Sequence, residues 1–227
     1  MKCDFHSHTF YSYDSVTSPK KIVEVAIKKG INCLAITDHG QIKGAIEAME
    51  YAKGKPILII PGIEIKTKDG DILGLNVKEI IPNKLSARET IKKIKELGGM
   101  VIIPHPFGWP FSFKGNLEEL KGEIDGIEIF NASIFNPKGN KKALGFVKKY
   151  NLPFTAGSDA HSPGFLGKAY LEIPGENLSI EQILKEVKNK NCKVVKEKIN
   201  YFEIIIDHFK RNIVKFFYHV NGKKGKI

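Results

Sequence analysis

Cysteine is scarce in this sequence and is not arranged for bonding. The 227 residues include three cysteines, Cys3, Cys33 and Cys192, which lie far apart and form no C-x-x-C pair. An odd number of widely spaced cysteines argues against both a disulfide framework and a thiolate zinc site. We therefore interpret all three as small buried hydrophobic residues.

Long apolar runs are also missing. The apolar run 57–61 is interrupted by Gly62 and Glu64, and this is well short of the roughly 18 apolar residues that a bilayer crossing needs. Residues 1–6 lack the apolar stretch of a secretory signal. We accordingly expect a protein that has no transmembrane segment and is located in the cytoplasm.

Arginine and negative charge are in short supply compared with lysine. Arg88 and Arg211 are the only arginines among 36 basic residues, and 25 acidic residues leave a net charge of +11. Hydrophobic residues make up 42% of the chain and charged residues 27%, a balance that excludes disorder as the main state. Positive charge attracts phosphates, nucleic acids and anionic membranes, but most lysines are scattered over predicted helices as a solvated surface. The charge alone therefore names no substrate.

Short apolar runs alternate with amphipathic stretches along most of the chain. Strands or extended segments are predicted over residues 2–8, 31–37, 57–64, 72–77, 100–104, 126–130, 153–158, 169–173 and 193–195. Helices are predicted over residues 19–29, 42–53, 86–97, 138–150 and 179–189. This alternation indicates an α/β protein with a parallel sheet, either an open doubly wound sheet or a closed barrel. No linker or internal repeat divides the chain, so we expect one domain over residues 1–196.

Residues 197–227 have a different pattern. Apolar residues recur at spacings of three and four, which predicts one stripe along a helix: Ile199, Phe202, Ile206, Phe209, Ile213, Phe216 and Val220. The stripe is expected to pack against the parent domain. The alternatives are a homodimer contact or a basic helix on a membrane surface, the latter favoured by nearby lysines. We expect residues 221–227 to fray.

Polar residues gather where the predicted strands end. These residues are His6 and His8, Asp38 and His39, Glu64, His105, Asn131, and Asp159 and His161. In parallel α/β folds the carboxyl ends of the strands meet at one crevice or barrel mouth, where active sites are assembled. We therefore expect these side chains to lie close together.

The spacing of the histidines favours metal binding. His6 and His8 are two residues apart on a strand, so both side chains point to the same face and can hold one ion. Asp159 and His161 repeat this spacing, and Asp14 lies in the loop after His8. Clustered imidazoles and carboxylates need compensating cations, and mixed nitrogen and oxygen ligands suit Zn²⁺, Mn²⁺ or Fe²⁺. The number of ligands exceeds the demand of one tetrahedral ion, which predicts a site for two or three.

The sequence resembles the PHP (polymerase and histidinol phosphatase) superfamily of metal-dependent phosphoesterases. The resemblance rests on His6-x-His8, Thr37-Asp38-His39-Gly40, Gly62-Ile63-Glu64, Pro104-His105-Pro106 and Gly157-Ser158-Asp159-Ala160-His161. The motif blocks stand in family order between residues 4 and 161, and Gly167-Lys168 resembles the segment that follows.

The resemblance implies a distorted seven-stranded (β/α) TIM-like barrel with the metal site at the C-terminal mouth of its strands. By analogy, one ion is bound by His6, His8, Glu64 and Asp159, a second by Glu64 and His105, and a third by Asp14, His39 and His161. Asn131 stands where the family often carries His or Cys, and its amide oxygen is a poorer ligand. Asp38 is assigned to orienting a ligand histidine, with a structural salt bridge as the alternative.

The implied mechanism is attack on phosphorus by a metal-bridging hydroxide, with the ions and a nearby lysine stabilising charge on the phosphoryl oxygens. Lys168 is the first candidate for this lysine because its position resembles that of a basic residue common in the family. Lys114, in the loop 108–114 after His105, is the second candidate. The aromatic residues of that loop could stack on a base, line a small pocket or simply pack as a lid.

The leading hypothesis is a phosphoesterase that acts on a nucleotide or another phosphorylated small molecule. The alternatives are a nuclease acting on DNA or RNA ends, supported by the charge of +11, and a histidinol-phosphate phosphatase. A further alternative is a non-catalytic, metal-stabilised scaffold that binds nucleic acid or a partner protein through the tail helix.

Overall fold

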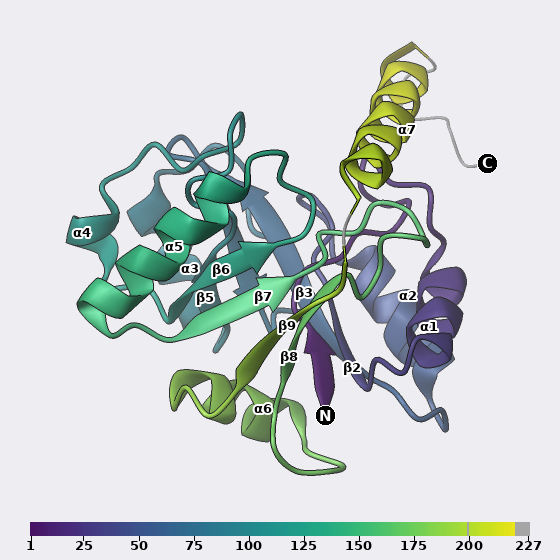
Figure 1. Ribbon diagram of the computed structural model, residues 1–227, viewed down its shortest axis with the longest axis horizontal. Helices are drawn as coiled ribbons and strands as arrows, with labels where there is room; N and C mark the ends of the chain where they lie inside the picture. The colour runs from purple at the N-terminus through teal and green to yellow at the C-terminus, as the bar shows by residue number, and fades with distance from the viewer. Residues whose placement is uncertain (199, 221–227) are drawn as a thin grey trace.

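Figure 1 shows the computed structural model of the chain, in which residues 1–198 and 200–220 are described. The strands are β1 (Lys2–Asp4), β2 (Cys33–Ile36), β3 (Leu58–Lys66), β4 (Asp71–Leu75), β5 (Met100–Ile103), β6 (Gly126–Asn131), β7 (Phe154–Gly157), β8 (Ala169–Glu172) and β9 (Lys193–Lys196). The helices are α1 (Pro19–Lys28), α2 (Lys43–Ala52), α3 (Ala87–Glu96), α4 (Leu117–Leu120), α5 (Pro137–Tyr150), α6 (Ile180–Lys188) and α7 (Tyr201–Val220). The short helix α4 is the one helix in the described residues that the sequence pattern did not predict.

The strands form a single sheet in the order β7-β6-β5-β4-β3-β2-β1-β8-β9. The pairs β1–β2, β2–β3, β5–β6 and β6–β7 are parallel, as the alternation of strands and helices predicts. The parallel arrangement is interrupted at β4, which pairs antiparallel with both β3 and β5. A tight turn at Gly70 (φ +127°) reverses the chain directly after β3, so no crossover helix intervenes. Strand β8 is likewise antiparallel to β1, and β9 to β8.

The sheet curls into a distorted, nearly closed barrel. The chain just after β1 runs beside β7 and its continuation, where the Phe5 amide donates to the Ala156 carbonyl (3.3 Å) and the Asp159 amide to the His6 carbonyl (2.8 Å). Ser7 and Ala160 form a parallel bridge at the same place. Seven strands from β7 to β1 therefore make a TIM-like barrel, and β8 and β9 extend the sheet beyond β1. Of the two predicted arrangements, the barrel is confirmed.

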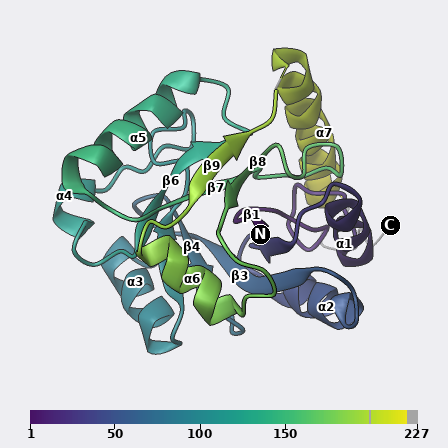
Figure 2. The ribbon, with the colours of Figure 1, turned by 60° about the horizontal axis from the view of Figure 1, so that its bottom comes forward.

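Helices α1, α2, α3, α5 and α6 lie around the sheet (Figure 2), and each of them buries small or apolar residues on its inner side. Helix α1 begins at Pro19 after the Ser18 N-cap, whose side chain accepts a hydrogen bond from the Lys21 amide. Helix α3 begins with the capping box that Ser86 and Glu89 form. These caps fix where the helices start, and hence where the loops leave the barrel mouth.

Helix α7 confirms the predicted tail helix but not its orientation. The apolar stripe faces solvent: Phe202, Phe209 and Phe216 are 63–65% exposed. The expectation that this stripe packs against the parent domain is therefore wrong. The residues that face the barrel lie between the stripe positions, and they include Asp207 and Arg211, which ion pairs hold in place. Ile199 and the segment 221–227 lie outside the described residues. None of the described helices is long and apolar enough to cross a membrane.

The carboxylate of Asp4 holds the barrel seam together. It is 1% exposed and accepts hydrogen bonds from the Ser158 amide (2.9 Å), the Ser158 hydroxyl (2.5 Å) and the Gly167 amide (3.1 Å). We predict that Asp4→Ala lowers the free energy of unfolding by about 3 kcal/mol, since it leaves buried donors without an acceptor. Urea unfolding measures this change, with Glu79→Ala, at an exposed position, as the control. Equal stability of the two variants would contradict the assignment.

The homodimer contact predicted for the apolar stripe of α7 can be tested directly, because the stripe is exposed. Its spacing of three and four is that of a helix seam, which a second copy of the same helix could match. We predict that Phe209→Glu lowers the molar mass measured by light scattering from that of a dimer to that of a monomer. The matched control is Lys210→Glu at the neighbouring exposed position. A wild-type protein that is already monomeric at high concentration would rule out this contact.

Candidate metal centre

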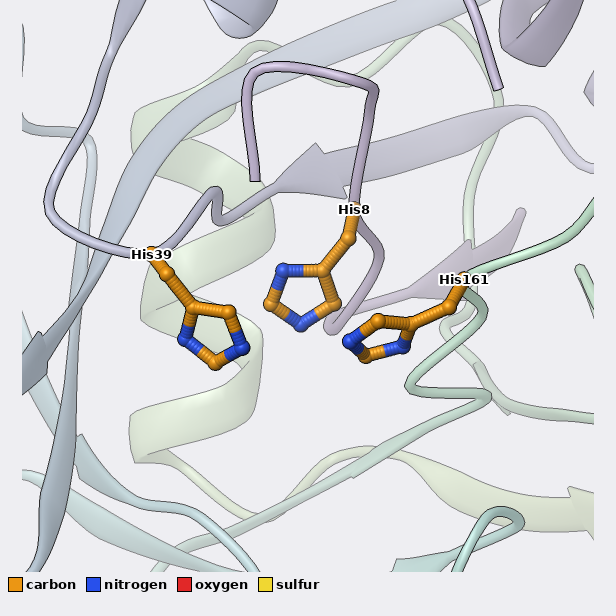
Figure 3. Close-up of side chains that lie close together, drawn as sticks. All are labelled: His8, His39 and His161. Atoms are coloured by element: carbon orange, nitrogen blue, oxygen red, sulfur yellow. The ribbon is translucent and has the colours of Figure 1, made fainter. Parts of the chain in front are cut away.

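The predicted ligands do meet at the carboxyl ends of the barrel strands. His6 and His8 follow β1, His39 follows β2, Glu64 lies in β3, and His105 follows β5. Asp159 and His161 follow β7, which the barrel seam places beside the end of β1. Figure 3 shows the rings of His8, His39 and His161 converging on one space.

Backbone strain helps to aim two of these side chains. His105 and Asp159 have φ angles of +32° and +49°, in a region that side-chain-bearing residues rarely adopt. Such conformations persist only where the surrounding structure holds them. Here the Asp159 amide is held by the His6 carbonyl (2.8 Å), and the His105 amide by the carboxylate of Glu128 (2.8 Å).

Three overlapping groups of side chains could each hold an ion. They are His8, His39 and His161; His6, Glu64 and His105; and His6, His8 and Asp159. Within each group the candidate ligand atoms lie within 4.8 Å of one another. All members are buried except His39, which is half-buried.

Glu64 stands at the centre of these groups. Its Oε2 atom lies 3.3 Å from Nε2 of both His6 and His8 and 3.1 Å from Nδ1 of His39, while its Oε1 atom lies 3.4 Å from Nε2 of His105. One carboxylate thus faces four imidazoles from two sides. This arrangement suits a carboxylate that bridges two ions.

Unpartnered polar atoms at the edge of the cluster indicate that a cation belongs there. Asp14 Oδ1 and His161 Nε2 are buried 3.3 Å apart, yet neither has a hydrogen-bond partner. Asp14 Oδ1 also lies 3.5 Å from Nε2 of His39. Buried polar atoms without partners are costly, and a divalent cation is the group that a carboxylate and two imidazoles would satisfy together. The residues present therefore fit the metal centre predicted from the sequence.

The charges of the cluster shift the pKa values of its imidazoles. Burial alone would lower the pKa of His39, but the carboxylates of Glu64 and Asp14 outweigh it and raise the pKa to about 9. Burial is likewise outweighed at His105, where the hydrogen bond and charge of Glu64 raise the pKa to about 9. Without metal, both rings are therefore protonated at neutral pH.

The PHP domain family profile matches residues 4–205, which is most of the chain. The chain belongs to the PHP family. An uncharacterised protein of Methanocaldococcus jannaschii, MJ0417, is 32% identical over 214 residues, covering 88% of this chain and 84% of that protein. A 5'-3' exoribonuclease of Haemophilus influenzae is 37% identical over 99 residues, which cover 42% of this chain and 36% of that enzyme.

A solved structure shares the fold. The two-domain protein from Bacteroides vulgatus that contains a predicted PHP-like metal-dependent phosphoesterase aligns with a TM-score of 0.74 and 21% identity, covering 93% of this chain and 69% of that one. The PHP motifs of the sequence thus lie in a PHP barrel, around a cluster able to bind metal.

Asp38 lies behind the PHP cluster and reaches His8 through Ser12. Its buried carboxylate accepts hydrogen bonds from the Thr9 amide (2.6 Å) and the Ser12 hydroxyl (2.9 Å). The Ser12 hydroxyl in turn lies 3.0 Å from Nδ1 of His8 and accepts a hydrogen bond from the His39 amide (3.0 Å). This chain of contacts agrees with an orienting role for Asp38 and not with a salt bridge, since no basic side chain pairs with it in the described residues.

Asn131 is close to the cluster, but its oxygen points elsewhere. The amide nitrogen donates to Glu128 Oε2 (2.9 Å) and to Asp159 Oδ2 (3.3 Å), while the amide oxygen accepts from the Ser133 backbone (2.9 Å). The oxygen predicted to bind an ion is therefore engaged, and Asn131 here orients two carboxylates.

The two candidate lysines lie away from the cluster. The Lys168 ammonium pairs with Glu203 (2.9 Å) at the start of α7 and lines a separate cavity together with Lys29 and Lys198. Lys114 is exposed, and its amide donates to the Asp69 carbonyl. Neither lysine lines the cavity over the candidate metal ligands. The cations that do so are Lys66, Arg211 and Lys215.

Glu128 is a buried acid of the site that the sequence pattern did not predict. It lies in β6 and is 1% exposed. Its Oε1 atom lies 3.1 Å from Nδ1 of His6, and its Oε2 atom accepts a hydrogen bond from the His105 amide. A carboxylate that accepts a hydrogen bond from the outer nitrogen of a ligand histidine fixes its tautomer and ring orientation. The available signal was a single charge between Ile127 and Ile129 in an otherwise apolar strand.

We predict that the affinity for Mn²⁺ or Zn²⁺ rises with pH from 6.5 to about 9. An ion binds the neutral imidazole, so the protons of His39 and His105 must leave, and each displaced proton makes the affinity rise by about tenfold per pH unit. Calorimetric titration at several pH values measures the slope, and His39→Asn should reduce it by one proton. An affinity that does not change over this pH range would contradict the assigned pKa values.

Proposed function

We propose that this protein is a metal-dependent phosphoesterase that hydrolyses phosphate esters of nucleotides or other small molecules. The observation that carries the proposal is the convergence of three ligand groups around Glu64, next to the unpartnered atoms Asp14 Oδ1 and His161 Nε2. A cluster of this kind has more ligands than a single structural ion needs, and several of its members, among them Glu64, His105 and Asp159, line a cavity.

The resemblance to the PHP family implies which residues would hold the ions. His6, His8, Glu64 and Asp159 would hold one, Glu64 and His105 a second, and Asp14, His39 and His161 a third. Divalent ions such as Mn²⁺, Zn²⁺ or Fe²⁺ would activate water and neutralise charge on the phosphoryl oxygens.

The chain itself supplies the rigidity that such chemistry needs. Glu128 holds the ring of His6, and Asp38 holds that of His8 through Ser12. The ring of Tyr13 stacks on His39, with centroids 4.9 Å apart. These three histidines are thus fixed from behind before substrate arrives, which keeps reacting groups in a productive geometry.

A nuclease acting on the ends of DNA or RNA is the second candidate. It is supported by the similarity to the Haemophilus influenzae 5'-3' exoribonuclease and by the net charge of +11. Nuclease activity on longer chains should fall steeply with salt, because phosphate contacts release counterions, whereas hydrolysis of a small phosphate ester should depend on salt only weakly. The histidinol-phosphate phosphatase and the non-catalytic scaffold have no separate observation in their favour.

Hydrolysis of a panel of phosphate esters tests the proposal. The panel contains p-nitrophenyl phosphate, its bis ester, mononucleotides, nucleoside bisphosphates, histidinol phosphate, and short RNA and DNA, each with Mn²⁺ added. We predict that the wild type releases product from at least one of them and that His8→Ala and Asp159→Ala lower the rate by about 100-fold or more, as loss of a charge-stabilising group does.

Metal analysis and a control variant make the result interpretable. Glu79→Ala, at an exposed position, should retain the wild-type rate, and metal content should fall in the two ligand variants. A wild-type protein that binds metal but hydrolyses no member of the panel would reject the enzyme and favour the scaffold.

A further inference from the structure

The face of α7 that meets the barrel is polar. Asp207 is 3% exposed and accepts a hydrogen bond from the Ser162 hydroxyl (2.5 Å), and His208 donates to the Ser133 carbonyl (3.0 Å). Apart from Ile204, which is 6% exposed and packs in the core, the helix docks through polar side chains, while Phe202, Phe209 and Phe216 face solvent. Burying charged groups is unfavourable, which suggests that this largely polar face has a function.

Arg211 reaches from this face into the metal cluster. Its side chain is only 9% exposed, and one terminal nitrogen donates to the Asp159 carbonyl (2.8 Å), lies 3.3 Å from the Asp159 carboxylate and touches the His161 ring. Its Nε lies 3.2 Å from Asp207 Oδ2 in the same helix. A guanidinium has five donors in a planar fork, so Arg211 has donors to spare toward the cavity.

Lys215 follows one turn later on the same face. Its ammonium lies 3.5 Å from Asp14 Oδ2 and sits over the ring of Tyr13. Lys215 and Arg211 line the same cavity as Asp14, His39, Glu64, His105, Asp159 and His161. The candidate metal ligands thus share one cavity with the positively charged side chains of Arg211 and Lys215. This arrangement suits an anion that contacts bound metal ions on one side and these two side chains on the other.

The cavity is small. Its volume of about 70 Å³ compares with the about 300 to 1,000 Å³ of pockets that enclose whole ligands. It can take the reacting group of a substrate, while the rest of that substrate must lie outside. The family profile ends at residue 205, so Arg211 and Lys215 lie beyond the part of the chain that defines a PHP domain.

We propose that α7 completes the active site, with Arg211 and Lys215 binding the phosphoryl group of a phosphate monoester. The proposal rests on the proposed phosphoesterase function. A monoester has three terminal oxygens and up to two negative charges, so it can contact ions on one side and the guanidinium fork on the other. A diester offers two terminal oxygens and one charge, and its second substituent would have to pass the wall formed by α7.

The test measures phosphate binding and hydrolysis separately in the full-length, Mn²⁺-loaded protein. Inorganic phosphate is titrated calorimetrically, and kcat and KM are measured for p-nitrophenyl phosphate and its bis ester. Arg211→Gln should weaken phosphate binding by about tenfold or more and lower kcat/KM for the monoester by about 100-fold, with Mn²⁺ content unchanged. Lys215→Gln should act in the same direction but less strongly, and Arg211→Lys should restore part of the binding because it keeps the charge without the fork.

The chain offers matched controls for both substitutions. Arg88→Gln, at the other arginine, and Lys210→Gln, at an exposed lysine of α7, should leave both readouts unchanged. Wild-type phosphate affinity in Arg211→Gln and Lys215→Gln would overturn the proposal, as would loss of Mn²⁺ from Arg211→Gln, which would make Arg211 a residue that holds metal ligands. If Arg211→Gln does not fold, Arg211→Lys and Lys215→Gln decide the outcome.

Two further outcomes separate this proposal from the proposed function. Hydrolysis of the bis ester as fast as that of the monoester would overturn the monoester preference while leaving a phosphoesterase. A wild-type protein that hydrolyses no member of the panel would reject the phosphoesterase, whereas phosphate binding that depends on Arg211 would still support the anion site.

Discussion

The structure depends on the cost of burying charge. Four imidazoles face the two oxygens of Glu64 at 3.1–3.4 Å in the barrel mouth, where little water reaches them. Such a cluster is stable only if protons or cations balance its carboxylates. In the metal-free protein protons do so, which is why the pKa values of His39 and His105 rise to about 9. Metal ions would take over that balance, so the same electrostatics that stabilise the fold select its cofactor.

The barrel seam makes this concentration of charge possible. His6 and His8 come from the first strand and Asp159 and His161 from β7, more than 150 residues later, and they meet because the chain after β1 hydrogen-bonds to the chain after β7. Buried side chains behind the ligands then hold them in place. Asp4 ties the seam, Glu128 holds His6, and Asp38 holds His8 through Ser12. The side chains behind the candidate ligands therefore keep the site rigid.

The sequence allowed prediction of the features that depend on local pattern. Periodicity and capping residues located nearly all of the helices, and the positions of His6, His8, Glu64 and Asp159 at strand ends predicted that they would meet. Orientation was harder to predict. The reversal at β4 follows from one turn, and the role of Asn131 depends on which end of its amide faces Glu128. The apolar stripe of α7 predicted a helix but not which side of the helix docks on the barrel. The ion pairs of Asp207 and Arg211 decide which side docks, and a hydrophobic pattern does not record ion pairs. Lys168 was chosen by its place in a motif, whereas Arg211 is distant in sequence and gave no local signal.

The short connection between β9 and α7 raises the effective concentration of Arg211 and Lys215 at the barrel mouth. The helix begins at Tyr201, shortly after β9 ends at Lys196, so its inner face is tethered close to the barrel mouth. A tether this short gives the tethered group an effective concentration of the order of millimolar or more. Arg211 can therefore bind in the cavity without strong docking of the helix itself. Connectivity within one chain does here what affinity does between separate molecules.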